Sequence, residues 1–446
     1  MLITAKFGGT SLASAAQFKK VLAIIKQTPN RRYIVPSAPG KRDPYDEKIT
    51  DILYRAGREA RDGTDFSSTL NAVKKRYADI CTELNLSLDI DAVFEKIEKR
   101  MLTDTEAYAA SRGEFVSGLI LSDLLNIPFV DPTEMIFFDE DGCLLLEKTR
   151  RAIARRLSTE ECAVIPGFYG ACMATGEILT FSRGGSDITG ALIAAATGSD
   201  LYENWTDVSG FLAADPRIVN DPRHISSLTY SELRELSSMG ANVLHPDAVL
   251  PVKRANIPIN VRNTNAPSHC GTLIVPDGAN VFDSKRNTNY TGVTGVAGKR
   301  GYTSVTVTKE YSSSDFGFAR RALHAFEACS IPVMHMPSGI DRFTIITATS
   351  ALKDKREMLA HELNAMCGVN NVEFFDDIAL IATVAANLIK TTGFAAKLFS
   401  ALSDAKINVS MIDLGSGASS IVFGVMDVDF ESAIKAVYNA FFLQRI

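Results

Sequence analysis

The chain has 446 residues, a length that suggests about three domains or one large domain plus smaller ones. Its composition, 46% apolar and 22% charged, is typical of soluble globular proteins. Its formal net charge of -5 argues against general nucleic-acid binding, because proteins that bind a phosphate backbone present positive surfaces. Seven scattered cysteines without CxxC spacing indicate neither a disulfide framework nor a zinc site, and no apolar run reaches the ~18 residues that span a membrane. We therefore expect a cytoplasmic protein with reduced thiols.

The first half of the chain alternates short β-type runs with helical runs. Residues 2–7 are β-like and end at Gly8-Gly9, and apolar residues then recur at helical spacing from Leu12 to Ile25. Further short apolar runs lie at 32–36, 127–130, 163–166 and 178–181. Residues 51–110 are charged and helix-favouring. Strands separated by helices predict an α/β fold, with a mainly parallel sheet sandwiched by helices.

A polar, turn-rich stretch at 275–292 marks the predicted domain boundary, and an internal repeat follows it. Gly317-Phe318-Ala319 recurs as Gly393-Phe394-Ala395, 76 positions later. Each copy reads as a strand, a helix that starts at the Gly-Phe-Ala triplet, two strands and a second helix. This order predicts a split βαβ unit used twice. We expect domains at 1–280, 290–375 and 376–446, with residues 292–297 pairing with the last.

The first loop, Lys6-Phe7-Gly8-Gly9-Thr10-Ser11, has the features of a phosphate site. Adjacent glycines let backbone N–H groups approach an anion, and we expect Thr10 and Ser11 to cap the helix that follows. Lys6 can place an ammonium beside a phosphoryl group in transfer. A tight turn with a solvated lysine is the alternative, since the loop is neither a Walker A loop nor GxGxxG.

A second loop, Ser182-Arg183-Gly184-Gly185-Ser186-Asp187, repeats the design between a predicted strand and a helix. Arg183 offers a planar fork for a carboxylate or phosphate. Asp187 either caps the helix or faces the phosphates and orients Lys6 or a magnesium-bound water. Two such loops in one α/β domain predict a site of converging loops at the strand ends. A third segment, 205–217, reads as a nucleotide contact or as an ordinary loop.

In this order along the chain, the segments KFGGTS, SRGGSD, WTDVSG with ADPR, and GANVLHP resemble the aspartate kinases of the amino acid kinase family. The repeat resembles the paired ACT modules that bind feedback amino acids, and the similarity is greatest to the short, lysine-sensitive monofunctional type. It implies an amino acid kinase fold followed by two ferredoxin-like βαββαβ modules. The implied reaction transfers the γ-phosphate of ATP, bound with Mg²⁺, to the β-carboxylate of L-aspartate, the first step of lysine, threonine and methionine biosynthesis.

The resemblance also implies roles for individual residues. Lys6 would stabilise the transferring phosphoryl group, with Asp187 keeping Lys6 and the metal in place. Nucleotide contacts are expected from Lys6, Gly8, Gly9, Thr10, Ser11, Thr206, Asp207, Leu212, Arg217 and Asn242. The substrate pocket is expected from Ser37, Thr50, Glu114, Arg183 and Ser186, with Arg183 gripping the α-carboxylate and Glu114 pairing with the α-ammonium. No protein side chain is expected to bind the metal directly. Asn242 and Leu212 depart from the lysine and tyrosine of many relatives.

The acceptor carboxylate is already ionised at neutral pH, so the reaction needs charge neutralisation and positioning rather than a general base. Two alternatives stay open: another carboxylate kinase of the same fold, such as a glutamate kinase, and a non-catalytic amino-acid sensor. The candidate contacts for an effector are Asp315, Phe316, Ser338 and Asp341. The alternative is that the segments containing these residues are ordinary loops. We expect lysine as effector, with threonine as a second candidate, and a homodimer or larger assembly through the ACT modules.

Overall fold

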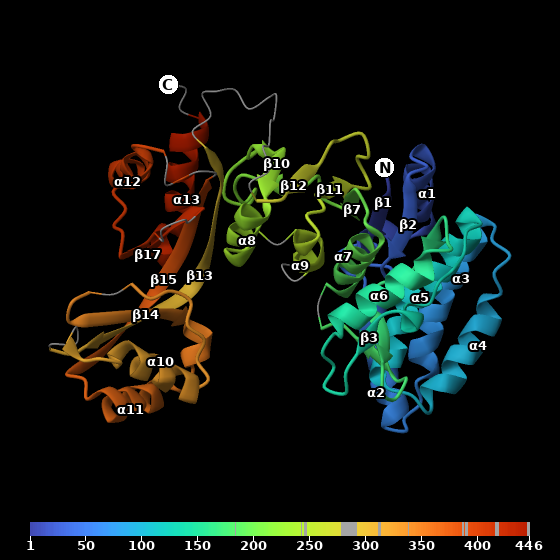
Figure 1. Ribbon diagram of the computed structural model, residues 1–446, viewed down its shortest axis with the longest axis horizontal. Coiled ribbons are helices and arrows are strands. Elements are labelled where there is room, and N and C mark those ends of the chain that lie inside the picture. Colours follow the sequence, from blue (N-terminus) through green and yellow to red (C-terminus); the bar gives the residue numbers. More distant parts are fainter. Residues whose placement is uncertain are drawn as a thin grey trace. The chain divides into compact units, whose positions relative to one another are not determined.

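The computed structural model describes residues 1–182, 184–241, 243–244, 248–277, 292–310, 314–337, 339–385, 388, 391–414 and 419–443. The chain divides into two compact units, which we describe separately (Figure 1). Unit 1 comprises Met1–Phe211, Ser226–Tyr230 and Val243–Val281, and unit 2 comprises Leu212–Ile225, Ser231–Asn242 and Phe282–Ile446.

Unit 1 is built on a seven-stranded sheet of order β10-β12-β11-β7-β1-β2-β4. Its strands are β1 (Ile3–Phe7), β2 (Arg31–Pro36), β4 (Ala163–Val164), β7 (Leu201–Thr206), β10 (Ser227–Thr229), β11 (Ile259–Asn263) and β12 (Thr272–Val275). All neighbours are parallel except β11 and β12. Because β1 pairs with β2 on one side and β7 on the other, the sheet grows outward from β1 in both directions. Ligands of open parallel sheets bind at such a switch point, beyond the carboxyl ends of the strands.

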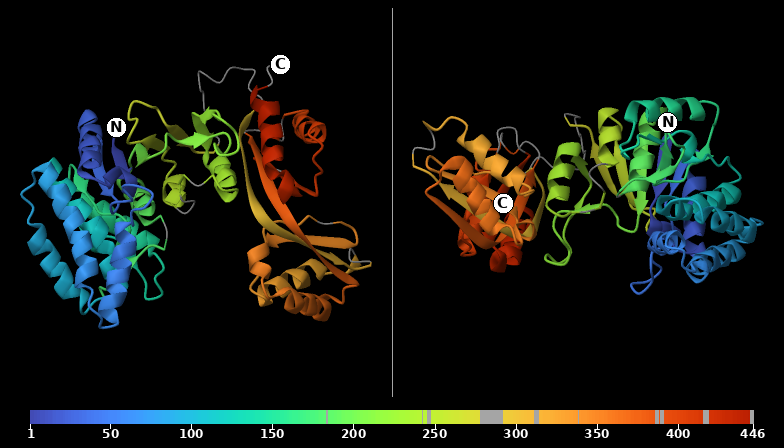
Figure 2. Two further views of the ribbon diagram at one scale, coloured as in Figure 1. Left: turned by 180° about the vertical axis from the view of Figure 1, so that it is seen from behind. Right: turned by 90° about the horizontal axis from the view of Figure 1, so that it is seen from below.

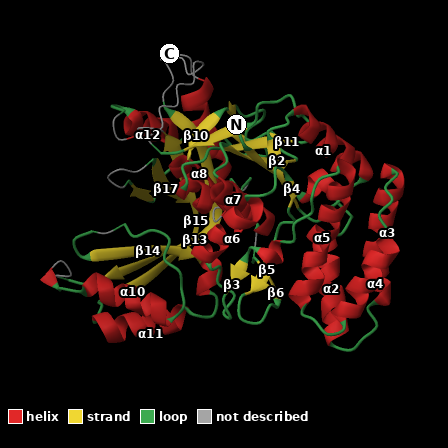
Figure 3. Cartoon of the chain, turned by 45° about the vertical axis from the view of Figure 1, so that its right-hand side comes forward, coloured by secondary structure: helices red, strands yellow, loops and turns green. Residues whose placement is uncertain are grey.

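Helices cover both faces of this sheet (Figure 3). The helices of unit 1 are α1 (Ala15–Gln27), α2 (Ile49–Arg61), α3 (Ser67–Leu84), α4 (Ile90–Met101), α5 (Glu106–Leu125), α6 (Leu146–Leu157), α7 (Gly185–Thr197) and α9 (Val249–Arg254). Helices α2 to α5 pack side by side, blue to cyan in Figure 2, which confirms the predicted helical layer after residue 51.

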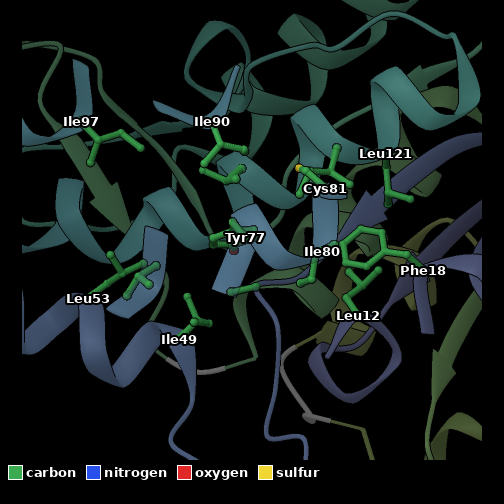
Figure 4. Close-up of a cluster of buried hydrophobic side chains, with 14 of the residues drawn as sticks. Leu12, Phe18, Ile49, Leu53, Tyr77, Ile80, Cys81, Ile90, Ile97 and Leu121 are labelled. Carbon is green, nitrogen blue, oxygen red and sulfur yellow. The ribbon is translucent and has the colours of Figure 1, made fainter. Parts of the chain in front are cut away.

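Each face of the sheet has its own apolar core. Ala5 and Phe7 of β1 point into a core that includes buried side chains of α1 to α5, among them Phe18, Leu53 and Tyr77 (Figure 4). A second core on the opposite face joins β2 to α6 and α7. Side chains alternate along a strand, so Lys6, which lies between Ala5 and Phe7, points away from the first core and toward α7.

A smaller sheet in unit 1 joins β3 (Phe137–Phe138), β5 (Tyr169–Cys172) and β6 (Ile178–Thr180). Strands β8 (Phe211–Leu212) and β9 (His224–Ile225) form a two-stranded sheet whose residues, except Phe211, belong to unit 2. The run at 178–181 therefore lies outside the main sheet, against our expectation, because β6 folds back antiparallel on β5. The run at 127–130 forms only an isolated bridge, Phe129 to Val164, rather than a strand.

Unit 2 contains an antiparallel sheet of order β14-β13-β15-β17-β16. Its strands are β13 (Val293–Thr308), β14 (Arg342–Ala348), β15 (Asn371–Ala385), β16 (Met411–Asp413) and β17 (Ser420–Met426). Its helices are α10 (Phe318–Ala328), α11 (Arg356–Cys367), α12 (Phe394–Asp404) and α13 (Phe430–Tyr438), and α8 (Tyr230–Ser238) runs into this unit from unit 1. None of the described helices in either unit combines the length and apolar character needed to cross a bilayer.

The internal repeat is visible in the structure. Gly317 and Gly393 precede α10 and α12 with φ of 85° and 81°, a left-handed conformation that glycine adopts without strain. The halves of the long strands β13 and β15 serve different copies, since residues 293–299 pair with 380–385 while residues 302–308 pair with both β14 and 371–378. The predicted fold class, a helix-covered parallel sheet plus ACT-type modules, is confirmed. The exact domain bounds stay a prediction.

Candidate active site

Lys6 and Asp187 meet at the carboxyl end of β1. Lys6 Nζ lies 2.5 Å from Asp187 Oδ1, and the two side chains are only 9% and 16% exposed. Asp187 lies in the first turn of α7, on the same face of the sheet as the Lys6 side chain. The same Oδ1 accepts a hydrogen bond of 2.7 Å from Asn204 Nδ2 of β7. The site therefore has a buried cation whose position is fixed by one carboxylate oxygen.

The second loop places Asp187 at this point through the start of α7. Helix α7 begins at Gly185, and its N-cap residue is Gly184, which has φ of +60° and no side chain that could cap the helix. A Cβ on Gly167, just beyond β4, would lie 2.6 Å from Ser186 Cβ, so the helix start approaches the end of β4 closely. Arg183 lies outside the described residues, and its role stays a prediction.

The glycines of the first loop permit backbone-to-backbone packing. Gly8 N–H donates to the Trp205 carbonyl at 2.8 Å, and Gly40 N–H donates to the Gly9 carbonyl at 2.7 Å. A Cβ on Gly9 would lie 2.8 Å from the Ala38 carbonyl oxygen, so only glycine allows this approach. The loop after β1 is thus held directly against the loop that carries Ser37, which is buried and donates its N–H to the Phe7 carbonyl.

The expectation that Thr10 and Ser11 cap the following helix is wrong. The chain first makes a 3₁₀ turn over Gly9–Leu12, and α1 begins only at Ala15, with Ser14 at its N-cap position. Ser11 is buried, and its hydroxyl pairs with the Thr264 hydroxyl at 2.7 Å. The N–H groups near an incoming phosphate would therefore be those of the glycines and the 3₁₀ turn rather than those of α1.

Glu114 of α5 is a buried carboxylate with unused hydrogen-bonding capacity. It is 5% exposed, and its Oε2 has no hydrogen-bond partner. Burial raises the pKa of Glu114 to about 8, although the Ala38 N–H and the nearby cations Arg112 and Lys6 act in the opposite direction. A buried oxygen without a partner is costly, so this arrangement suits a carboxylate that receives a cation when a ligand binds.

Thr50 lies near the same loop. It is half-buried in the first turn of α2, next to Ile49, whose N–H faces the Pro39 carbonyl at 3.4 Å. Gly113 allows α5 to approach, because a Cβ there would lie 2.7 Å from Ala38 Cβ. The predicted substrate residues Ser37, Thr50 and Glu114 are thus all joined to the 37–40 segment.

The predicted nucleotide residues divide between the units. Thr206 ends β7 beside Gly8, and its hydroxyl donates to the neighbouring Asp207, which is exposed. Leu212 and Arg217 belong to unit 2, where the Arg217 guanidinium binds both oxygens of Asp215. Asn242 lies outside the described residues. The nucleotide contacts of these residues stay predictions.

Two buried arginines that the sequence analysis did not identify hold elements of unit 1 together. Arg31 donates to both oxygens of Glu203, which also accepts from Trp205 Nε1, on the face of β7 opposite Asn204. On α3, Arg76 donates to the Ala13 and Gly40 carbonyls and lies 3.2 Å from Asp46. Arg76 therefore joins the first loop to the 37–48 segment. Neither residue lies in a motif, which is why spacing could not identify them.

Within the part of the chain that the structure describes, no three His, Cys, Asp or Glu side chains come together as a set of metal ligands. Mg²⁺ in phosphoryl transfer keeps several waters and binds mainly through phosphates and one or two carboxylates. The half-buried carboxylate of Asp187 would suit that mode of binding.

The candidate effector residues of unit 2 lie at the start of α10 and before β14. Asp315 is bound by Lys309 at 2.5 Å and by Arg321 through both oxygens, and these partners hold the pKa of its carboxyl below the usual range. Phe316 is 98% exposed, and Asp341 is exposed at the turn into β14. Ser338 lies outside the described residues. Effector binding by any of them stays a prediction.

Comparison with known proteins identifies the family. The model of the amino acid kinase family matches residues 1–263, and an ACT domain model matches residues 381–441. The chain belongs to the aspartokinases of the amino acid kinase family. It is 34% identical to aspartokinase 3 of Bacillus subtilis, with 98% of both chains covered.

Solved structures of such enzymes have the same fold. Aspartate kinase of Clostridium acetobutylicum is 44% identical, with a TM-score of 0.89 over 99% of both chains. Escherichia coli aspartokinase III in complex with aspartate and ADP has a TM-score of 0.75 at 24% identity and covers 99% of this chain and 100% of its own, which supports the fold alone.

Proposed function

We propose that this protein is an aspartate kinase, which transfers the γ-phosphate of ATP to the β-carboxylate of L-aspartate and forms 4-phospho-L-aspartate. The observation that carries the proposal is that two groups of ionisable side chains, both largely shielded from solvent, lie at one end of the parallel sheet. One is the Lys6–Asp187 pair, and the other is Glu114 with its unpartnered Oε2. Lys6 suits the transferring phosphoryl group, and Glu114 suits the α-ammonium of an amino acid.

The chemistry follows from charge. The acceptor carboxylate and the polyphosphate are both anionic, so the barrier falls when fixed positive groups lie where they meet. Lys6 supplies one such group at the end of β1, and the N–H groups of Gly9 and Thr10 would supply partial positive charge. Positioning brings the carboxylate in line with the γ-phosphorus, and no proton has to be removed.

Mg²⁺ would bind with ATP and neutralise the β- and γ-phosphate oxygens. The half-buried carboxylate of Asp187 contacts Lys6, and it would hold both the lysine and, through water, the metal. Asp207, exposed beside Thr206, would face the nucleotide. Removing the metal with a chelator should abolish the transfer while leaving the fold intact.

Substrate selection would rest on Arg183 and Glu114, which bind the two charges on Cα of aspartate. Ser37, Thr50 and Ser186 would complete the pocket. A glutamate kinase is the nearest alternative. Its substrate has one methylene more than aspartate, and a pocket discriminates between substrates that differ by one methylene by about 1–3 kcal/mol of transition-state binding energy. A non-catalytic sensor is disfavoured by the retained Lys6–Asp187 pair.

The test is trapping of the acyl phosphate with hydroxylamine. With ATP and Mg²⁺, the purified chain should convert L-aspartate to its β-hydroxamate far faster than it converts L-glutamate to the corresponding product. Faster conversion of glutamate would establish the alternative kinase. No hydroxamate from either amino acid, with nucleotide still bound, would establish the sensor.

Unit 2 would regulate this activity. E. coli aspartokinase III has been solved with lysine and aspartate in a T-state, and that enzyme is similar to this chain in fold. By the same design, lysine would bind at the ACT-type modules here, with threonine as the second candidate. The modules would also join subunits into a homodimer or larger assembly, and the protein would act in the cytoplasm.

A further inference from the structure

Asn204 is a buried amide in a strand whose two faces serve different purposes. Tyr202, Asn204 and Thr206 of β7 share one face, while Glu203 and Trp205 point to the other. Asn204 is 3% exposed, and in the parallel pairing of β1 with β7 it lies directly beside Lys6. Neither loop motif includes it, and the catalytic roles assigned above do not use it.

The amide and the lysine share one acceptor atom. Asn204 Nδ2 donates to Asp187 Oδ1 at 2.7 Å, and Lys6 Nζ lies 2.5 Å from the same oxygen. The two donors come from adjacent strands, and the acceptor comes from the first turn of α7. Rotation of the Asp187 carboxylate would therefore break two contacts rather than one.

The backbone of Asp187 is held from the same strand. Tyr202 Oη donates to the Asp187 carbonyl at 3.1 Å. This requires a close approach of α7 to β7, which Gly190 permits, because a Cβ there would lie 2.6 Å from Tyr202 Oη. Tyr202 thus fixes the main chain of Asp187, and Asn204 fixes its side chain.

We propose that Asn204 is a positioning residue for phosphoryl transfer, holding Asp187 Oδ1 so that Lys6 stays at the end of β1. This inference rests on the proposed kinase function. A neutral donor on Oδ1 also withdraws negative charge from the oxygen that Lys6 contacts, so more of the lysine charge is available to the phosphoryl group. Aspartate at position 204 would lack the donor and add a like charge, and leucine would fill the volume without a hydrogen bond.

The test compares N204L and N204D with T4V. Thr4 is a matched control, because it is buried on the same face of β1 as Lys6. Its hydroxyl forms a hydrogen bond of 2.9 Å with the hydroxyl of Ser199, just after the end of α7. Each variant is assayed for kcat and for the KM of aspartate and ATP by hydroxamate formation, and for thermal unfolding. N204L should lose about tenfold or more in kcat with both KM values within twofold of the wild type, and N204D should lose more. T4V should keep the wild-type kcat.

Two results would overturn the inference: wild-type kcat in N204L, or losses in T4V equal to those in N204L, which would reveal a purely structural role. The wild type separates this inference from the proposed function. A wild-type chain that forms no hydroxamate refutes the function itself, whereas an active wild type with a fully active N204L refutes only the role of Asn204.

Discussion

At the scale of single residues, the buried Glu114 makes folding stability depend on pH. Its ordinary pKa of 4.5 is raised to about 8 in the folded chain, mainly by burial. The folded state thus holds a proton that the unfolded chain releases, so stability is full below pH 4.5 and falls as the pH rises toward 8.

The substitution Glu114→Gln tests this linkage. The glutamine variant keeps the shape without the charge, so its unfolding temperature should match the wild type at pH 4.5 and exceed it at pH 8.5, without ligands. The measurement is thermal unfolding across this range, with the low-pH pair as the internal control. A wild type that remains as stable as the variant at pH 8.5 would show that Glu114 ionises freely in the fold.

Arg183 is assigned to the α-carboxylate of aspartate through the family resemblance. Replacing it with alanine removes a charge-assisted contact worth about 1.5–3 kcal/mol. We expect the KM for aspartate to rise about 10- to 100-fold, with a smaller change in the KM for ATP. Steady-state kinetics with each substrate varied separately would measure this, and an unchanged aspartate KM would remove Arg183 from the pocket.

Functional residues in the glycine-rich loops could be predicted from the sequence, whereas residues whose roles depend on tertiary contacts could not. Lys6 precedes one glycine pair and Asp187 follows another, each next to a strand end, and that spacing pointed to a shared site. Glu114 came only from the family resemblance, because a carboxylate inside a helix gives no local signal. Asn204 was not identified from the sequence. A signal was present, because β7 contains polar residues between apolar ones, and polar side chains are uncommon in buried strands unless they are hydrogen-bonded.

At the scale of elements, the contact between the loop after β1 and the loop after β2 depends on Gly9. A methyl group there would lie 2.8 Å from the Ala38 carbonyl and 3.0 Å from the Gly40 nitrogen, both backbone atoms that cannot move aside independently. The two loops would have to separate, which would move the N–H groups proposed to bind phosphate away from the proposed substrate residues.

We therefore expect Gly9→Ala to lower kcat/KM for ATP at least tenfold, since small misplacements at a reacting centre cost up to about 100-fold. Gly339→Ala is the control, because the nearest atom to its added methyl is 3.5 Å away. Kinetics of the two purified variants provide the measurement. Equal activity of both alanine variants would show that the loops tolerate separation.

The predicted elements were largely observed where periodicity was strong. The runs at 2–7 and 32–36 became adjacent parallel strands, and the charged segment after residue 51 became helices. The run at 178–181 joined a small antiparallel sheet instead, because hydrogen-bond pairing depends on distant partners that a local pattern does not specify. The 3₁₀ turn after β1 was missed for a similar reason, since Ser11 bonds to Thr264 rather than to its own helix.

At the scale of the whole molecule, the repeat predicts regulation of unit 1 by an amino acid bound to unit 2. L-Lysine added to the full chain should lower the rate of hydroxamate formation and raise the unfolding temperature, because a ligand that binds the folded state stabilises it. D-Lysine is the matched control, and L-threonine tests the second candidate. If neither L-amino acid changes the rate or the unfolding temperature, the proposed effectors are wrong.

The sequence anticipated the two-part organisation through its repeat, and it also led us to expect that residues 292–297 pair with the last module. In the structure, residues 293–299 pair with residues 380–385. The repeat did not indicate that β13 and β15 are continuous strands that serve both copies, because strand continuity past the repeat boundary is a tertiary property without a local marker.

The central claim is that Lys6, held by Asp187, stabilises the phosphoryl group during its transfer to aspartate. The most direct measurement is the kcat of the Lys6→Met variant in the hydroxamate assay. Calorimetric titration with ADP shows in parallel whether the fold and the nucleotide site persist. The account predicts a loss of about 100- to 1,000-fold in kcat with ADP still bound. A Lys6→Met variant that binds ADP and retains near-normal kcat would contradict it.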